Sequence, residues 1–234
     1  MARSVLVTGG NRGIGLAIAT AFAEAGDKVA ITYRSGEPPA GLFGVRCDVT
    51  DSASVRRAVE EVAAQQGAVE VLVSNAGITK DNLFIAMDEQ EFADVVDTNF
   101  MGSVRVTRAV VPDMVRLRRG RIIFVGSVVG MWGGPGITNY AASKSALIGF
   151  ARSLAWELGK RNITVNVVAP GVIETELIEH VDDKARAHIM GNTAMRRPGR
   201  LAEVPPAVQF LASDGASYVT GALLPVSGGA AMGH

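Results

Sequence analysis

The sequence has a single cysteine, no net charge and no uncharged run with the character of a membrane span, and each shortage excludes a class of protein. Cys47 has no partner for an internal disulfide, so we expect a buried thiol and a reducing compartment. The 23 Lys and Arg residues equal the 23 Asp and Glu residues, and no basic run suits nucleic-acid phosphates or an anionic membrane surface. We therefore expect a cytoplasmic protein that binds no nucleic acid.

Two segments with few or no charges can be considered as membrane segments, and neither has the required composition. The first ten residues carry one arginine and a short apolar stretch broken by Gly9 and Gly10, which resembles neither a signal peptide nor an anchor. Residues 122–143 are uncharged, but they include five glycines, Pro135 and several polar side chains that no lipid-exposed helix combines. We interpret residues 122–143 as a buried strand followed by an active-site loop.

The order of apolar segments predicts an α/β fold. Apolar residues make up 48% of the chain, enough for a substantial core. With about 150 residues per domain as a guide, we expect residues 1–234 to form a single domain. Short apolar runs alternate with segments of helical period, the pattern of a parallel sheet with helices on both faces. The prediction is a Rossmann fold with a seven-stranded parallel sheet.

The expected elements follow from these periods. The strands are predicted over Ser4–Thr8, Lys28–Tyr33, Leu42–Cys47, Val69–Ser74, Arg121–Gly126, Ile163–Ala169 and Ala222–Val226. The helices are predicted over Gly13–Ala25, Ser52–Gln66, Glu89–Leu117, Thr138–Gly159 and Leu201–Ala212. We expect Pro112 to bend or break the third helix. Residues 34–42, with two prolines and two glycines, are predicted to form a loop, and residues 171–198 a mobile lid.

A cluster of glycines joins the first expected strand to the first expected helix. Gly9, Gly13 and Gly15 have the spacing G-x3-G-x-G. Glycines there permit a tight turn and let the backbone approach a pyrophosphate, which the N-terminus of a helix attracts. A bare strand-to-helix turn is the alternative, because the commoner dinucleotide spacing is G-x-G-x-x-G.

The second expected strand ends without a carboxylate. Enzymes of this fold that use NAD usually place Asp or Glu there, where it accepts hydrogen bonds from the ribose hydroxyls. This strand instead ends in Tyr33 and Arg34. Arg34 and Arg12 of the glycine loop are suited to a 2′-phosphate, which favours NADPH over NADH. Two solvated surface arginines are the alternative.

Tyr140 and Lys144 lie four positions apart in an expected helix and therefore share a face. A tyrosine with its usual pKa of about 10 is a slow acid or base at neutral pH, and a neighbouring ammonium or a cationic nicotinamide lowers that pKa. Ser127 follows the fifth strand, at the carboxyl end where open α/β sheets bind ligands. Its hydroxyl can donate to a carbonyl oxygen. Each pattern alone also arises by chance.

Taken together, these motifs resemble the short-chain dehydrogenase/reductases over nearly the whole chain. The matching residues are Thr8-Gly9-x3-Gly13-Ile14-Gly15, Asp48, Asn75-Ala76-Gly77, Asn99, Ser127, Tyr140-x3-Lys144 and Pro170-Gly171-x3-Thr175. The segments around Ser127 and Tyr140 are similar to those of the 3-oxoacyl-[acyl-carrier-protein] reductases. The short link at residues 34–42, Trp132 and the terminal Gly-His resemble the actinobacterial members.

The resemblance implies a role for each matching residue. Tyr140 would give a proton to a ketone oxygen, and Lys144 would lower the pKa of Tyr140 and hold the nicotinamide ribose. Ser127 would position the carbonyl, and Asn99 would hold a water. The residues implied to contact NADPH or NADP are Gly9, Asn11, Arg12, Gly13, Ile14, Arg34, Asp48, Val49, Asn75, Ala76, Gly77, Tyr140, Lys144, Pro170, Gly171, Ile173 and Thr175. No metal site is expected. As alternatives, Asn99 serves only a helix kink, or Asp48 only caps the next helix.

The implied activity is NADPH-dependent reduction of 3-oxoacyl-[acyl-carrier-protein] to the 3-hydroxyacyl form in fatty acid biosynthesis, by a homotetramer. Arg118 and Arg161 match the arginines that contact the carrier in the family. Departures at Ile137, Thr138 and Ala86 leave the acyl substrate open. A ketoreductase for a polyketide or another small ketone and a non-catalytic NADP-binding regulator are the alternatives.

Overall fold

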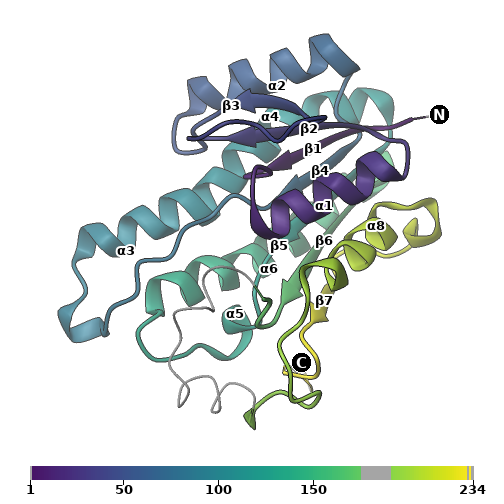
Figure 1. Ribbon diagram of the computed structural model, residues 1–234. Helices are drawn as coiled ribbons and strands as arrows, with labels where there is room; N and C mark the ends of the chain where they lie inside the picture. The colour runs from purple at the N-terminus through teal and green to yellow at the C-terminus, as the bar shows by residue number, and fades with distance from the viewer. Residues whose placement is uncertain (1, 175–190, 231, 233–234) are drawn as a thin grey trace.

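The computed structural model describes residues 2–174, 191–230 and 232, and its centre is one parallel sheet (Figure 1). The seven strands have the order β3-β2-β1-β4-β5-β6-β7, and every neighbouring pair is parallel. Their bounds are β1 Ser4–Thr8, β2 Lys28–Tyr33, β3 Phe43–Arg46, β4 Val71–Ser74, β5 Gly120–Val125, β6 Ile163–Pro170 and β7 Leu223–Val226. The predicted Rossmann-type α/β fold is confirmed.

Helices cover both faces of the sheet (Figure 1). One face carries α1 Gly13–Glu24 and α8 Pro205–Ala212, and the other carries α2 Ser52–Gln66, α4 Gly102–Leu117 and α6 Thr138–Leu158. Two shorter helices are α3 Glu89–Val96, which packs against α6, and α5 Val129–Trp132. Short 3-10 turns occupy Phe84–Ala86, Gly159–Arg161, Leu201–Glu203 and Asp214–Ala216.

The central strands are apolar on both faces because both faces are buried. Every residue of β1, β5 and β6 is buried. Alternate side chains enter opposite halves of the core: Val5 and Val7 pack with α1 and α8, whereas Leu6 packs on the side of α2, α4 and α6. Since all strands are parallel, their carboxyl ends meet at one edge of the sheet, and the functional residues gather there.

Pro112 does not break its helix, so that part of the prediction was wrong. Helix α4 continues through Pro112, and the expected helix is interrupted earlier, by a π-helical turn at Asp97–Met101. Pro112 is exposed, so the lost N–H bond and the displaced carbonyl face solvent. The π turn contains Asn99, whose side chain bonds to Ile78 and to Ser143. Tertiary hydrogen bonds, and not the proline, therefore coincide with the break.

The other differences are small. The helix expected over Leu201–Ala212 is a 3-10 turn followed by α8, which begins at Pro205. No helix lies between β2 and β3, as predicted for residues 34–42. Residues 122–143 form most of β5, the following loop, α5 and the start of α6. Most of the expected lid, residues 175–190, lies outside the described part of the chain. No described helix has the length and hydrophobicity needed to cross a bilayer.

Candidate active site

The turn between β1 and α1 leaves room for a close approach by a ligand. Gly9 and Gly13 have φ values of +63° and +54°, a region that glycine adopts without strain. A Cβ on Gly15 would lie 2.3 Å from the carbonyl oxygen of Gly9, so the helix passes directly against the turn. Helix α1 begins after Arg12 with no side-chain cap, and its first N–H groups have no partner within the helix. These features fit a pyrophosphate.

Thr8 and Asn75 hold this turn in place. The Oγ1 of Thr8 accepts hydrogen bonds from the N–H groups of Asn75 and Ala76, at 2.9 and 3.0 Å. In return, the Asn75 Nδ2 donates to the carbonyls of Thr8 and Gly9, at 3.0 and 3.1 Å. The ends of β1 and β4 are thereby joined under the glycine turn. That Asn75, Ala76 and Gly77 line a ribose stays a prediction.

Tyr140, Lys144 and Ser127 come together where β5 ends, as the sequence predicts. The Nζ of Lys144 lies 5.6 Å from the ring centroid of Tyr140. The Ser127 hydroxyl lies close enough to that of Tyr140 to lower the pKa of the phenol, and its Oγ accepts from the Val129 N–H at 3.4 Å. The Lys144 Nζ donates to the carbonyl of Val125 at 2.8 Å. A hydroxyl pair and a buried ammonium therefore share one small volume at the carboxyl edge.

Burial sets the charge states of this group. Loss of hydration raises the pKa of Tyr140 above its ordinary value, and the hydrogen bond from Ser127 acts against that rise. Loss of hydration lowers the pKa of Lys144 to about 8. The sequence led us to expect a net decrease for Tyr140. In this arrangement burial is the larger effect, and the ammonium is directed to the Val125 carbonyl.

Asn99 connects the loop after β4 to helix α6. Its fully buried side chain accepts from the Ile78 N–H at 2.8 Å and donates to the Ile78 carbonyl at 3.0 Å. Its Nδ2 also donates to the Ser143 Oγ at 3.0 Å, and that hydroxyl donates to the carbonyl of Tyr140 at 2.8 Å. Asn99 therefore lies in an irregular helix turn and also braces the site. The water proposed for it stays a prediction.

Asn139 forms a second brace beside Tyr140. This side chain is fully buried, and its Nδ2 donates to the Lys80 carbonyl at 2.9 Å while its Oδ1 accepts from the Tyr140 N–H at 2.7 Å. Sequence reasoning missed Asn139 and Ser143. The sequence pattern that could have indicated them is two polar residues, four positions apart, on the otherwise apolar buried face of a helix. Lack of space also favours glycine at position 77, since a Cβ on Gly77 would lie 3.0 Å from the Asn99 Oδ1.

The adenosine end of the candidate site is formed by exposed residues. Arg12 and Arg34 are both exposed, and the Asn11 Nδ2 donates to the Ser35 carbonyl at 3.2 Å, which ties the glycine turn to the loop after β2. The pKa of Asp48 is below its ordinary value, mainly because its carboxylate accepts from the hydroxyl and the N–H of Thr50. The alternative role for Asp48, that it only caps the next helix, was wrong, because a different residue caps α2.

The residue that caps α2 is Asp51, whose side chain accepts from the Ala53 N–H. Val49, expected at the adenine, is buried against Gly102, where a Cβ would lie 2.8 Å from the Val49 Cγ2. Only part of Val49 can therefore face a ligand. Asp48 and Val49 remain predicted contacts.

The expected carboxamide end follows β6. Pro170 ends that strand, its carbonyl accepts from the Val128 N–H at 3.0 Å, and the Gly171 N–H donates to the Val226 carbonyl at 3.0 Å. The side chain of Ile173 is 5% exposed and packs in the core, so only its backbone is available to a ligand. Thr175 lies outside the described residues.

Arg118 and Arg161 lie on neighbouring turns of the chain, away from Tyr140. The Arg118 Nη2 donates to the carbonyl of Lys160 at 3.3 Å, and both arginines are exposed. They precede β5 and β6 and so lie at the amino edge of the sheet. Among the described residues, no group of three or more His, Cys, Asp or Glu side chains could hold a metal.

Comparison with known proteins agrees with this geometry. A family model described as Enoyl-(Acyl carrier protein) reductase matches residues 9–231. The chain belongs to the short-chain dehydrogenase/reductase family. It is 54% identical over 234 residues to 3-oxoacyl-[acyl-carrier-protein] reductase MabA of Mycobacterium avium, covering 100% of this chain and 92% of that protein. The identity is 51% to MabA of Mycobacterium tuberculosis, with 100% and 95% covered, and 46% to 3-oxoacyl-[acyl-carrier-protein] reductase FabG of Escherichia coli, with 97% and 96% covered.

Proposed function

We propose that this chain is an NADPH-dependent 3-oxoacyl-[acyl-carrier-protein] reductase of fatty acid biosynthesis. The observation that carries the proposal is the placement of the Ser127 and Tyr140 hydroxyls beside Lys144 at the carboxyl end of β5. Both hydroxyls can direct a hydrogen to one oxygen, which suits a ketone. The names of the relatives point to the same substrate class. An enoyl reductase, named by the family model, is the second candidate.

The residues present fit NADP. The uncapped start of α1 suits the pyrophosphate, Arg12 and Arg34 suit the 2′-phosphate, and Lys144 suits the nicotinamide ribose. When bound, NADPH supplies the hydride that adds to the carbonyl carbon. The other residues that the resemblance implies in NADP binding are part of the same proposal.

The proton comes from the protein. The Oη of Tyr140 gives its proton to the ketone oxygen, while the Oγ of Ser127 donates a hydrogen bond that holds this oxygen in place. Burial keeps Tyr140 protonated at neutral pH, since its pKa is raised. Below a pH of about 8 the charged form of Lys144 predominates, and this charge stabilises the phenolate left after proton transfer.

A direct assay tests the proposed function. Purified protein is mixed with NADPH and with matched 3-oxoacyl, enoyl and polyketide-like thioesters, and NADPH oxidation is followed. We expect the 3-oxoacyl thioesters to have the highest kcat/KM. A preference for the enoyl thioester would support the second candidate, and a preference for polyketide-like ketones would support a paralogous ketoreductase. Binding of NADP without turnover of any thioester would contradict catalysis.

We place the acyl carrier protein at the patch of Arg118 and Arg161. Both side chains are exposed, and neither forms an ion pair with a described acidic residue, so their charge is free to meet an acidic carrier. The eight residues of β6 place this patch roughly 25 Å from the carboxyl edge. Charge reversal at both arginines is expected to raise KM for carrier-bound substrate and to leave that for a free thioester unchanged.

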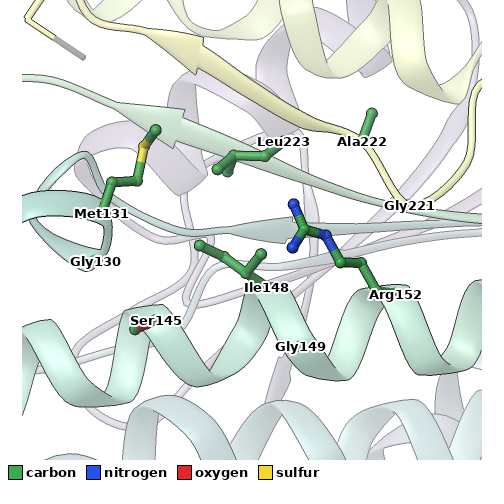
Figure 2. A pocket seen from close by; sticks show the side chains of 9 residues that line it. All are labelled: Gly130, Met131, Ser145, Ile148, Gly149, Arg152, Gly221, Ala222 and Leu223. Carbon is green, nitrogen blue, oxygen red and sulfur yellow. The ribbon is translucent and has the colours of Figure 1, made fainter. Parts of the chain in front are cut away.

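We also propose that α6 packs against another subunit of a homotetramer. A groove of about 700 Å³ runs beside the helix, and Figure 2 shows Met131, Ile148 and Leu223 lining it. Gly149 lies in the helix interior with no atom within 4 Å of a built Cβ, and Trp156 is 88% exposed. A glycine there costs about 1 kcal/mol of helix stability but lets a neighbouring chain approach closely. Light scattering that shows a concentration-independent monomer would contradict the tetramer.

A further inference from the structure

We propose that Arg46 is a third guanidinium of the 2′-phosphate site and increases the preference of this protein for NADP over NAD. The inference rests on the proposed function, because it concerns the NADPH site of that reductase. Arg46 ends the edge strand β3 and belongs to none of the motifs that point to Arg12 and Arg34.

The sheet register places Arg46 beside the loop that carries Arg34. Tyr33 and Arg46 are direct partners in the pairing of β2 with β3, so Arg34 follows one residue beyond this pair. The Nε of Arg46 donates to the carbonyl of Arg34 at 3.3 Å. This contact fixes the guanidinium at the carboxyl edge, where Arg34 leaves the sheet.

The same register places Arg46 on the face of the sheet that carries the glycine turn. Its neighbours Val45 and Cys47 point into the half of the core formed with α2, α4 and α6. Successive side chains of a strand point to opposite faces, so Arg46 lies on the face of α1. Arg12 precedes α1 directly, and its neighbour Asn11 donates to the Ser35 carbonyl, so the segments that carry the three arginines meet at one corner of the sheet.

The charge at this corner is not compensated by ion pairs. None of the three arginines forms an ion pair with a described acidic side chain. Arg34 is near enough to Asp48 to contribute to the low pKa of that carboxyl, but the carboxylate is bound to Thr50. A phosphate dianion would offset the repulsion among three exposed cations. Because Arg46 uses its Nε to bond the Arg34 carbonyl, both of its Nη atoms can donate to phosphate oxygens.

Calorimetric titration with NADP⁺ and NAD⁺ tests the proposal without turnover. Arg46→Gln is expected to weaken NADP⁺ binding about 5- to 10-fold and to leave NAD⁺ binding unchanged, because only NADP⁺ carries the 2′-phosphate. Arg46→Lys keeps the positive charge but loses the paired N–H donors of the guanidinium, so it should retain part of the preference for NADP⁺ over NAD⁺. The matched control is Arg56→Gln, which removes an exposed arginine from α2 and should change both affinities less than 2-fold.

The outcomes separate the two proposals. An Arg46→Gln protein with the unaltered NADP⁺ to NAD⁺ ratio would overturn the role of Arg46, and so would an equal loss for both ligands. An unaltered protein that binds NADP⁺ no more tightly than NAD⁺ would overturn the proposed cofactor itself. Thermal unfolding of each variant checks that its fold is retained. A loss specific to NADP⁺ that shrinks with added salt supports the third guanidinium.

Discussion

Two sets of positively charged side chains, one at each edge of the sheet, differ in whether acidic side chains pair with them. At the amino edge, three arginines other than Arg118 and Arg161 are paired with acids, in the contacts Arg3–Asp27 at 2.6 Å, Arg119–Glu70 at 3.4 Å and Arg121–Asp214 at 3.4 Å. At the carboxyl edge, Lys144, Arg12 and Arg34 form no ion pair with a described residue. Charge that is already compensated holds the fold together. Charge that is not compensated remains available to a ligand or to a developing anion.

Lys144 at the carboxyl edge is buried without a charged partner among the described residues, which costs stability. Lys144 is buried with one carbonyl as its recorded acceptor, and burial lowers its pKa to about 8. At the amino edge, Asp27 accepts three hydrogen bonds from Arg3, and the buried Arg121, whose pKa is also lowered by burial, is paired with Asp214. Buried charge without a charged partner is typical of functional sites, where stability is lower than elsewhere. Substitutions at the two edges should thus separate activity from stability.

The largest expected effect is on turnover and comes from the carboxyl edge. Tyr140→Phe removes the proton donor and is expected to lower kcat at least about 100-fold, with little change in NADP⁺ affinity. Steady-state kinetics and calorimetric titration measure the two quantities. Tyr218→Phe is the matched control, since Tyr218 is fully exposed and should tolerate the change. Near-normal turnover by Tyr140→Phe would refute the mechanism.

A smaller effect, on stability alone, is expected at the amino edge. Asp27→Asn leaves Arg3 without its partner and should lower the free energy of unfolding by about 2 kcal/mol, less than for a fully buried pair because the Arg3 side chain is 22% exposed. Chemical denaturation gives this value, and KM for NADPH should not change. The control is Asp113→Asn, which breaks an exposed pair with Arg116 on one helix and should cost less than about 0.5 kcal/mol. Equal losses for the two variants would contradict the comparison.

Much of the fold and part of the site could be predicted because their signals are local. Strands buried on both faces are continuous apolar runs, which is how β1, β5 and β6 were found. The glycine turn and the pair Tyr140 and Lys144 depend on spacing within a few residues, and so does the place of Ser127 after a strand. The family resemblance added Asn99 to the predicted site residues, although no local pattern singles out Asn99.

The features that were missed depend on contacts between distant segments. The π turn occurs where Asn99 bonds to Ile78 and Ser143, 21 and 44 residues away. Arg46 reaches Arg34 only through the register of β3 on β2. The carbonyl of Val125 that accepts from Lys144 is likewise 19 residues distant. Spacing along the chain predicts neither the partners of a buried polar group nor the edge on which an arginine pair lies.

The smallest effect is expected at Lys144, and its sign is opposite to that at Asp27. In the folded protein the pKa of Lys144 is about 8, below the value of 10.5 for an unperturbed lysine. The unfolded chain therefore binds more protons between these two values, so the stability of the unaltered protein rises from pH 8 to pH 10.5. Below pH 8 the cost of burying the ammonium is fully present. Lys144→Met removes this cost but leaves the Val125 carbonyl without its donor, for a net gain of about 1 kcal/mol at pH 7. Denaturation of both proteins across this pH range checks the prediction: the advantage of Lys144→Met should shrink as the pH rises, and an advantage that stays constant would show that burial of the charge is not its source.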